Sequence, residues 1–352
     1  MASGKSGPVF QALTAAMNSG PAQHRGDAFH RPRQQDYFYP TESGTWTSTS
    51  TTQTPAVTYS EPLINPKVIR LISWNIDVLV PFAEERMSAA LQYLEKLVTS
   101  TPADVPVVLF LQEMGISDLE QIRDSKWIHE RFNITELDGR HWLSPFYGTT
   151  TLIDRRLHIK SVFRVPWISK FDRDGLFVDV ALSGKESLDK EEKVLRLCNT
   201  HLESLVADPP VRPLQLSSAS KYLQQAEVAC ALLAGDLNAI QPFDQSLHSE
   251  NNLKDTYLAL GGEENSDNGY TWGYQVPRMD KILFRGNVQP RKFERIGMGV
   301  KVADEHRKAV IEAGEQEWVT DHYGVVGDFE LDEAWTLQSG DKNGASARSK
   351  LS

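Results

Sequence analysis

Cysteine is scarce in this sequence. Cys198 and Cys230 are the only two thiols among 352 residues, which is too few for a disulfide framework or a thiolate zinc site. A chain this poor in cysteine is typical of a reducing compartment. If the protein uses a metal ion, its ligands have to be oxygen and nitrogen atoms.

Long apolar runs are also absent. No stretch reaches the roughly 18 apolar residues that a membrane span requires, and the N-terminus lacks the hydrophobic segment of a secretory signal. We therefore expect no membrane partner and an intracellular protein, in the nucleus or the cytoplasm. Basic residues outnumber acids near the N-terminus, which leaves a mitochondrial transit peptide as an alternative; they are Lys5, Arg25, Arg31 and Arg33, against Asp27.

Positive charge is not in excess. The chain has 37 Lys plus Arg and 47 Asp plus Glu, a formal net charge of −10. This balance argues against a protein that coats long stretches of duplex by releasing counterions, so any nucleic acid is expected to be held locally. With 40% hydrophobic residues, the chain can bury a sizeable core.

Three regions differ in composition. Residues 1–64 lack sustained periodicity and contain the Ser/Thr-rich tract GTWTSTSTTQTPAVTYSEP, which predicts a disordered N-terminal region. From residue 65 to residue 332, short apolar runs alternate with helical patterns, which predicts one folded domain. Residues 333–352 are rich in Ser, Lys and Gly and predict a flexible tail.

The apolar runs predict strands, because they are β-branched and aromatic and most end in Gly, Pro or polar residues. They lie at residues 68–75, 105–113, 146–153, 157–167, 175–182, 193–201, 228–236, 279–286, 291–298 and 323–331. Helical patterns lie at 81–98, with Pro81 expected in the first turn, and at 212–226. The two groups of strands with helical cover predict an α/β fold, in which two sheets pack face to face between two helical layers.

Residues suited to metal or phosphate chemistry end four of these strands. Asn75 ends RLISWN, Glu113 ends VVLFLQE and His201 ends RLCNTH, while Asp236 and Asn238 end ALLAGDLN. A buried charge without a partner costs several kcal/mol, so a core strand that carries a carboxylate usually brings it to a rim where a partner meets it.

Two further strands show the opposite order. Asp280 precedes KILF, and Asp321 and His322 precede YGVV. If these strands run antiparallel to the first four, all six segments reach one rim. Each residue alone could instead be a turn residue, a helix cap, a solvated acid or a structural histidine, but the joint pattern favours a shared site.

The set suits hydrolysis of a phosphate ester with a hard cation. Glu113, with help from Asn75, offers oxygen ligands for Mg²⁺ or Mn²⁺. Asp236 could orient and deprotonate the attacking water, and Asn238 could donate its amide to the transition state. His201 would be a second donor at the phosphate.

His322 has two candidate partners. Either Asp280 or Asp321 could hold its imidazole in the protonated form, because a nearby carboxylate raises the pKa of a histidine. The resulting cation would stabilise negative charge that develops on the phosphate.

The motifs ISWNID, LQE, NTHLES, GDLN, RMDKILF and TDHYGV, in this order and spacing, resemble those of the endonuclease/exonuclease/phosphatase superfamily, whose members include deoxyribonuclease I. The resemblance covers residues 65–332. It implies a DNase I-like, four-layer α/β/β/α sandwich of two mainly antiparallel sheets, and a Mg²⁺-dependent phosphoesterase. It also implies that Glu113 binds the metal with Asn75 beside it, and that Asp280 orients His322.

Within the superfamily, WNID, THLES with Ser204, and YTW upstream of RMDKILFR look most like the subfamily of tyrosyl-DNA phosphodiesterase 2, which removes trapped topoisomerase tyrosine from DNA 5′ ends. This resemblance implies a phosphodiesterase for 5′-tyrosyl or otherwise blocked DNA ends in DNA repair. Its partner would be a single-stranded 5′ end or a DNA–protein adduct. Trp272 would stack beneath the terminal base, and Tyr147 and Arg173 would be groove residues. We expect a monomer.

The chain departs from this subfamily at three places. The subfamily usually reads WNIDGL and HLEST and has an Arg shortly after GDTN, where this chain has Val78, Leu205 and Ala239-Ile240. Other members of the superfamily cleave RNA tails, inositol phosphates or sphingomyelin, and fold and metal site do not fix the leaving group. A binding protein with a decayed site is a further alternative, although none of the required side chains is missing.

Overall fold

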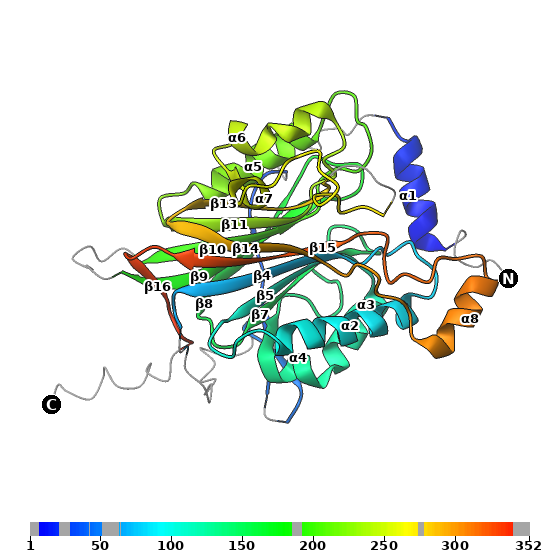
Figure 1. The fold of residues 1–352 in the computed structure, drawn as a ribbon, viewed down its shortest axis with the longest axis horizontal. Coiled ribbons are helices and arrows are strands. Elements are labelled where there is room, and N and C mark those ends of the chain that lie inside the picture. The colour runs from blue at the N-terminus through cyan, green and yellow to red at the C-terminus, as the bar shows by residue number, and fades with distance from the viewer. Residues whose placement is uncertain are drawn as a thin grey trace.

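Two β-sheets pack face to face between two layers of helices (Figure 1). The computed structural model describes residues 7–20, 29–41, 43–50, 63, 65–184, 192–273 and 278–340. The predicted four-layer α/β sandwich is confirmed. Both cysteines are buried and free. None of the helices in the described ranges is long and apolar enough to span a bilayer.

The first sheet has β10 and β11 at its centre, paired in parallel, with antiparallel strands on both sides. In spatial order its strands are β1 (Arg33–Gln34), β8 (Ile159–Pro166), β9 (Asp174–Gly184), β10 (Lys193–Thr200), β11 (Val228–Asp236), β13 (Asp280–Gly286) and β12 (Lys254–Asp255), with β16 (Trp335–Leu337) paired to β9. Its outer face carries α5 (Arg212–Leu223), η3 (Pro242–Gln245), α6 (Leu247–Glu250) and α7 (Thr256–Ala259).

The second sheet has the parallel pair β4 and β5 at its centre, again flanked by antiparallel strands. In spatial order its strands are β14 (Val288–Ile296), β15 (Gly324–Leu331), β4 (Val68–Asn75), β5 (Val107–Met114), β7 (Gly148–Asp154), β6 (Phe132–Ile134), β2 (Phe38–Pro40) and β3 (Trp46–Ser48). Its outer side carries α2 (Ala83–Thr99), α3 (Ile116–Asp124) and α4 (Lys126–Arg131), while α8 (Asp304–Glu312) and α1 (Pro8–Asn18) lie toward one end of the sandwich.

The alternation of side chains along each strand decides which residues face the other sheet. In β4, Ile69 and Leu71 belong to the core between the sheets, whereas Ile72 and Trp74 face the helices. Asn75 continues the inward set at the end of that strand. In the same way Asp236 continues the inward set of β11. The core residues that specify the sheets therefore also direct polar side chains inward at the rim.

The predicted domain boundaries at residues 65 and 332 are too narrow. Strands β1, β2 and β3 precede residue 65 and pair within the two sheets, and β16 follows residue 332. Phe38 and Tyr39 are buried, so these aromatic side chains outweigh the polar composition that predicted disorder for residues 29–50. Helix α1 also lies in the region predicted to be disordered. The rest of that region and of the tail, residues 1–6, 21–28, 42, 51–62, 64 and 341–352, lies outside the described residues. Helix α2 begins at Ala83, two residues after the expected Pro81.

Candidate active site

Each sheet contributes a row of polar residues to the same rim. Strand order places His322, Asn75, Glu113 and Tyr147 along the second sheet, at the ends of β15, β4, β5 and β7 that meet there. Since β15 runs antiparallel to β4, its beginning lies beside the end of β4. The predicted antiparallel arrangement is confirmed for this sheet.

The first sheet supplies the facing row. Asp280, Asp236, His201 and Arg173 lie at the ends of β13, β11, β10 and β9. Asp236 and Asp280 are direct partners in the antiparallel register of β11 and β13. The six segments predicted to converge do so, and the two rows bring their side chains into contact.

Asp236 is the centre of the cluster. Its Oδ2 accepts a hydrogen bond from Asn75 Nδ2 at 3.1 Å and lies 3.2 Å from His201 Nε2 and 3.7 Å from His322 Nε2. Its Oδ1 accepts from the backbone N–H of Asn238 at 2.8 Å. Burial alone would raise the pKa of Asp236, but His322 and His201 outweigh burial and hold it below its usual value. The carboxylate is therefore ionised at neutral pH.

The partner of His322 is Asp280. His322 Nδ1 donates to Asp280 Oδ2 at 2.9 Å, whereas Asp321 Oδ1 lies 3.8 Å from Nε2. Burial lowers the pKa of His322, but Asp280 and Asp236 raise it well above its usual value. Burial raises the pKa of Asp280 to about 6 against the opposing effect of His322, which leaves Asp280 ionised and His322 protonated at neutral pH.

The pKa of His201 is shifted in the opposite direction from that of His322. Burial, followed by the charge of Arg173, lowers its pKa despite the nearby Asp236, so the ring is neutral at neutral pH. Its Nε2 lies 2.9 Å from the side-chain amide of Asn238, and its Nδ1 lies 3.7 Å from Glu113 Oε1. The two histidines therefore offer one neutral ring and one cation.

Glu113 presents a carboxylate that is open to a ligand. Its backbone is left-handed, with φ of 53°, which is uncommon for a residue other than glycine and turns the side chain out of the strand alternation. The nearest cationic groups to its Oε1 are His201 at 3.7 Å and Arg173 at 3.8 Å. No described residue donates a hydrogen bond to this carboxylate, so its oxygens are free to bind a cation.

Asp77 belongs to the site but was absent from the predicted set. It follows Asn75 in WNID, has φ of 60° and donates its N–H to Asn75 Oδ1 at 2.9 Å. Burial first, and then the charges of Asp321 and Glu113, raise its pKa well above its usual value. Carboxylates that repel one another in this way fit a hard divalent cation, which would relieve the repulsion. An acid two positions after a strand-end amide was the available signal.

A second group of three atoms also has ligand spacing. Asp236, Asp280 and His322 offer atoms within 4.8 Å of one another. However, His322 donates its Nδ1–H to Asp280, and a protonated imidazole is not a metal ligand. Glu113 and its neighbours are therefore the better candidate metal site.

Arg173, Ser204 and Tyr147 lie together beside Glu113. Arg173 donates to Ser204 Oγ at 2.8 Å, and its guanidinium lies 5.5 Å from the centre of the Tyr147 ring. Tyr147 is only 5% exposed, and its hydroxyl donates to the carbonyl of Phe171. The ring is thus buried beside Arg173, and the expected role of Tyr147 as a groove residue stays a prediction.

Trp272 lies at the other end of the row. It forms an isolated bridge with His322, and its indole N–H donates to Asp321 Oδ2 at 2.7 Å. The ring is half-buried. Asp321 therefore orients Trp272 rather than the His322 ring, which answers the question that the sequence left open.

A buried amide pair connects the sheets beneath the site. Gln112 of β5 donates to Asn199 Oδ1 of β10 at 2.8 Å, and Asn199 donates to the carbonyl of Thr150 at 2.9 Å. Both amides precede predicted site residues, Glu113 and His201, but neither amide was in the predicted set. An amide at an inward-facing strand position was the signal, because such a group requires a partner.

The family of the chain follows from comparison with known proteins. The model of the endonuclease/exonuclease/phosphatase family matches residues 72–322. No curated protein matches the sequence. The solved structures similar to this chain include D. rerio TDP2 with a single-strand DNA product (TM-score 0.55, 19% identity, 75% of this chain and 99% of that chain), truncated Caenorhabditis elegans TDP2 (0.55, 19%, 75% and 98%), and the human Nocturnin catalytic domain with bound sulfate (0.51, 17%, 79% and 100%).

At these identities the structural similarity shows the fold alone, a sandwich shared by enzymes with different substrates. The family model carries more weight, since it spans more than half of the sequence and includes both the strand-end motifs and the rim residues described above. The chain belongs to the endonuclease/exonuclease/phosphatase family.

Proposed function

We propose that the protein is a Mg²⁺-dependent phosphodiesterase that hydrolyses 5′-tyrosyl-DNA or otherwise blocked 5′ DNA ends. The observation that carries the proposal is the environment of Asp236. Oδ2 of this ionised carboxylate lies near Nε2 of neutral His201 and Nε2 of cationic His322. The Glu113 carboxylate lies near the other nitrogen of the His201 ring, Nδ1.

Glu113 would hold Mg²⁺, or Mn²⁺, with the carbonyl oxygen of Asn75 and the carboxylate of Asp77 nearby. Asn75 Oδ1 accepts one backbone hydrogen bond and retains a second lone pair for a cation. When bound, the cation clamps a phosphate oxygen and neutralises charge that develops during hydrolysis.

Asp236 orients the attacking water and accepts its proton as the oxygen–phosphorus bond forms. The Asn75 amide and the Asn238 backbone N–H fix the direction of the carboxylate. The Asn238 side chain and His201 donate to the phosphate oxygens, and His322 supplies the positive charge that stabilises the transition state.

The remaining residues bind the two substituents of the phosphate. The half-buried ring of Trp272 would stack with the terminal base, and Arg173 with Ser204 offers a cation and a hydroxyl at the opposite end of the row. A protein of net charge −10 that holds only a strand end needs few phosphate contacts. The solved D. rerio TDP2 complex with single-strand DNA product supports a strand end as the substrate.

The test is a substrate panel with purified protein and Mg²⁺. The panel contains a 5′-phosphotyrosyl oligonucleotide, a plain oligonucleotide, poly(A) and an inositol phosphate, with Asp236→Asn as the inactive control. Selective turnover of the first substrate supports the proposal. Selective turnover of poly(A) or the inositol phosphate assigns another phosphoesterase activity, and no turnover of any substrate assigns a binding role.

A further inference from the structure

Helix α1 lies against the rim without being part of the core. None of its side chains is buried, whereas α2 buries seven. The half-buried residues of α1 recur at helical spacing and form its inner face; they are Val9, Ala12, Leu13 and Ala16. The outer face is open to solvent, with Phe10 36% and Met17 53% exposed. A helix with so little burial belongs to the part of a protein that opens most easily.

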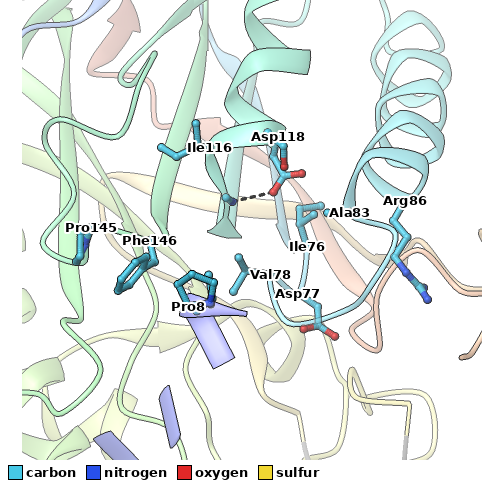
Figure 2. A pocket seen from close by; sticks show the side chains of 13 residues that line it. Pro8, Ile76, Asp77, Val78, Ala83, Arg86, Ile116, Asp118, Pro145 and Phe146 are labelled. Carbon is cyan, nitrogen blue, oxygen red and sulfur yellow. Dashed lines mark hydrogen bonds between the residues drawn. The ribbon is translucent and has the colours of Figure 1, made fainter. Parts of the chain in front are cut away.

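The first turn of α1 contacts loops of the second sheet. Pro8 and Val9 line a cavity of about 370 Å³ together with the loop after β4, the residues after β5 and the residues before β7. Figure 2 shows Pro8 beside Val78 and Phe146. Each of these loops also carries a residue of the two polar rows or their neighbourhood; the pairs are Val78 and Asp77, Gly115 and Glu113, and Phe146 and Tyr147.

The other end of α1 contacts loops of the first sheet. Lys170 Nζ donates to the carbonyl of Ser19, directly after the helix, at 3.0 Å. The last turn of α1 has no basic residue of its own, so Lys170 supplies the cation that the negative end of the helix dipole favours. Ser19 also lines a cavity of about 320 Å³ with Val206, in the loop after β10. Lys170 lies three positions before Arg173, and Val206 two positions after Ser204.

The helix therefore spans the two sheets at one end of the rim. In Figure 1, α1 lies beyond the strand ends at the right, between the two helical layers. Its contacts adjoin Glu113 and Tyr147 on one sheet and Arg173 on the other, whereas Trp272 lies at the opposite end of the rows with His322. A substrate that extends from the phosphate past Arg173 meets this helix.

We propose that α1 is a displaceable strap that closes the Arg173 end of the active site, so that extended substrates bind only when the helix moves away from the rim. This inference rests on the proposed phosphodiesterase function. A small phosphodiester occupies the phosphate-binding residues alone and does not require the strap to move. For an extended substrate, the apparent affinity is reduced by the fraction of molecules in which the strap is open.

The first experiment releases the strap in the full-length protein. Leu13→Asp places a charge on the inner face of α1, and Thr14→Asp is the matched control, because it places the same charge on the exposed face. The extended substrate is an oligonucleotide with a 5′-phosphotyrosyl peptide, and the small substrate is bis(p-nitrophenyl) phosphate. Leu13→Asp should raise kcat/KM for the extended substrate by about 10-fold or more and leave the small substrate unchanged. Thr14→Asp should change neither value.

The second experiment locks the strap. Cysteines introduced by Ser19→Cys and Lys170→Cys are joined with a short bismaleimide that contains a disulfide, and the native thiols do not compete because both are buried. The linked protein should lose most of its kcat/KM for the extended substrate and keep its activity on the small one. Reduction of the linker should restore the loss, and each single-cysteine variant, treated in the same way, should show none.

A binding series without turnover separates this inference from the proposed function. In an Asp236→Asn background, fluorescence anisotropy with the labelled extended substrate should show tighter binding for Leu13→Asp and weaker binding for the linked protein. Equal values for Leu13→Asp and Thr14→Asp, or a linked protein that binds and cleaves the extended substrate normally, would overturn the strap. A wild-type protein that cleaves neither substrate refutes the proposed function, while the binding series still decides on the strap. Absence of binding and of turnover in every variant would overturn both.

Discussion

Replacement of Asp280 by Asn tests whether His322 works as a cation. The two side chains form a buried pair, with 2.9 Å between Nδ1 and Oδ2 and with Asp280 1% exposed. Asn keeps the size of the side chain and an oxygen that can accept from Nδ1, so the ring keeps its orientation. The substitution removes the negative charge that raises the pKa of His322 most.

The magnitude follows from the difference between charged and neutral hydrogen bonds. Charged hydrogen bonds contribute about 1.5–3 kcal/mol and neutral ones about 1 kcal/mol, a difference of about 0.5–2 kcal/mol. Since one pKa unit corresponds to about 1.4 kcal/mol, the pKa of His322 should fall by roughly one unit. Activity that needs protonated His322 is lost as pH rises through this pKa, so the alkaline limb of the kcat/KM profile should move to lower pH by the same amount.

The assay is the pH profile of kcat/KM for an aryl phosphodiester, together with an NMR titration of the His322 ring. Asp328→Asn is the matched control, because it removes a carboxylate paired with Arg70 at 2.6 Å in β15 away from the rim. An alkaline limb that stays in place in Asp280→Asn, while the variant remains folded, would refute the role of a protonated His322.

Three further substitutions test other parts of the molecule. Glu113→Ala should lower kcat by two or more orders of magnitude and weaken Mg²⁺ binding in calorimetry. The control Glu120→Ala, at an exposed position, should change neither. An unaltered Mg²⁺ affinity in Glu113→Ala would exclude Glu113 as a ligand. Gly235→Ala places a Cβ 1.7 Å from the carbonyl oxygen of Thr200, at a φ of 147°. The free energy of unfolding should therefore fall by about 3 kcal/mol or more. A loss below about 1 kcal/mol in urea denaturation would contradict this packing. Trp272→Ala should raise KM for oligonucleotide substrates by about 10-fold or more through lost stacking on the terminal base. An unchanged KM in the folded variant would count against this role of Trp272.

The strands and the convergence of their ends were predictable from the sequence, because both depend on local patterns. The run VIRLISWN is β4 from Val68 to Asn75, and VACALLAGD is β11 from Val228 to Asp236. Each run is apolar on both faces, as expected for a strand buried between another sheet and a helical layer. The polar residue that ends each run, Asn75 or Asp236, lies at the rim.

The features that were missed depend on tertiary contacts. The left-handed backbone of Glu113 cannot be read from its residue type, and Tyr147 is buried by Arg173 and Phe171, which are distant in sequence. The strands before residue 50 are short and polar, and pairing with β6 and β8 stabilises them. Local composition carries no information on such pairing.

Because the site is divided between two sheets, turnover requires that the two sheets are docked against each other. Asp236 and His201 come from one sheet, Asn75 and Glu113 from the other, and the Gln112–Asn199 hydrogen bond joins them below the rim. An intermediate with both sheets formed but undocked would have native-like circular dichroism and no turnover. In a refolding experiment, recovery of turnover should therefore follow the closure of the interface rather than the formation of strands.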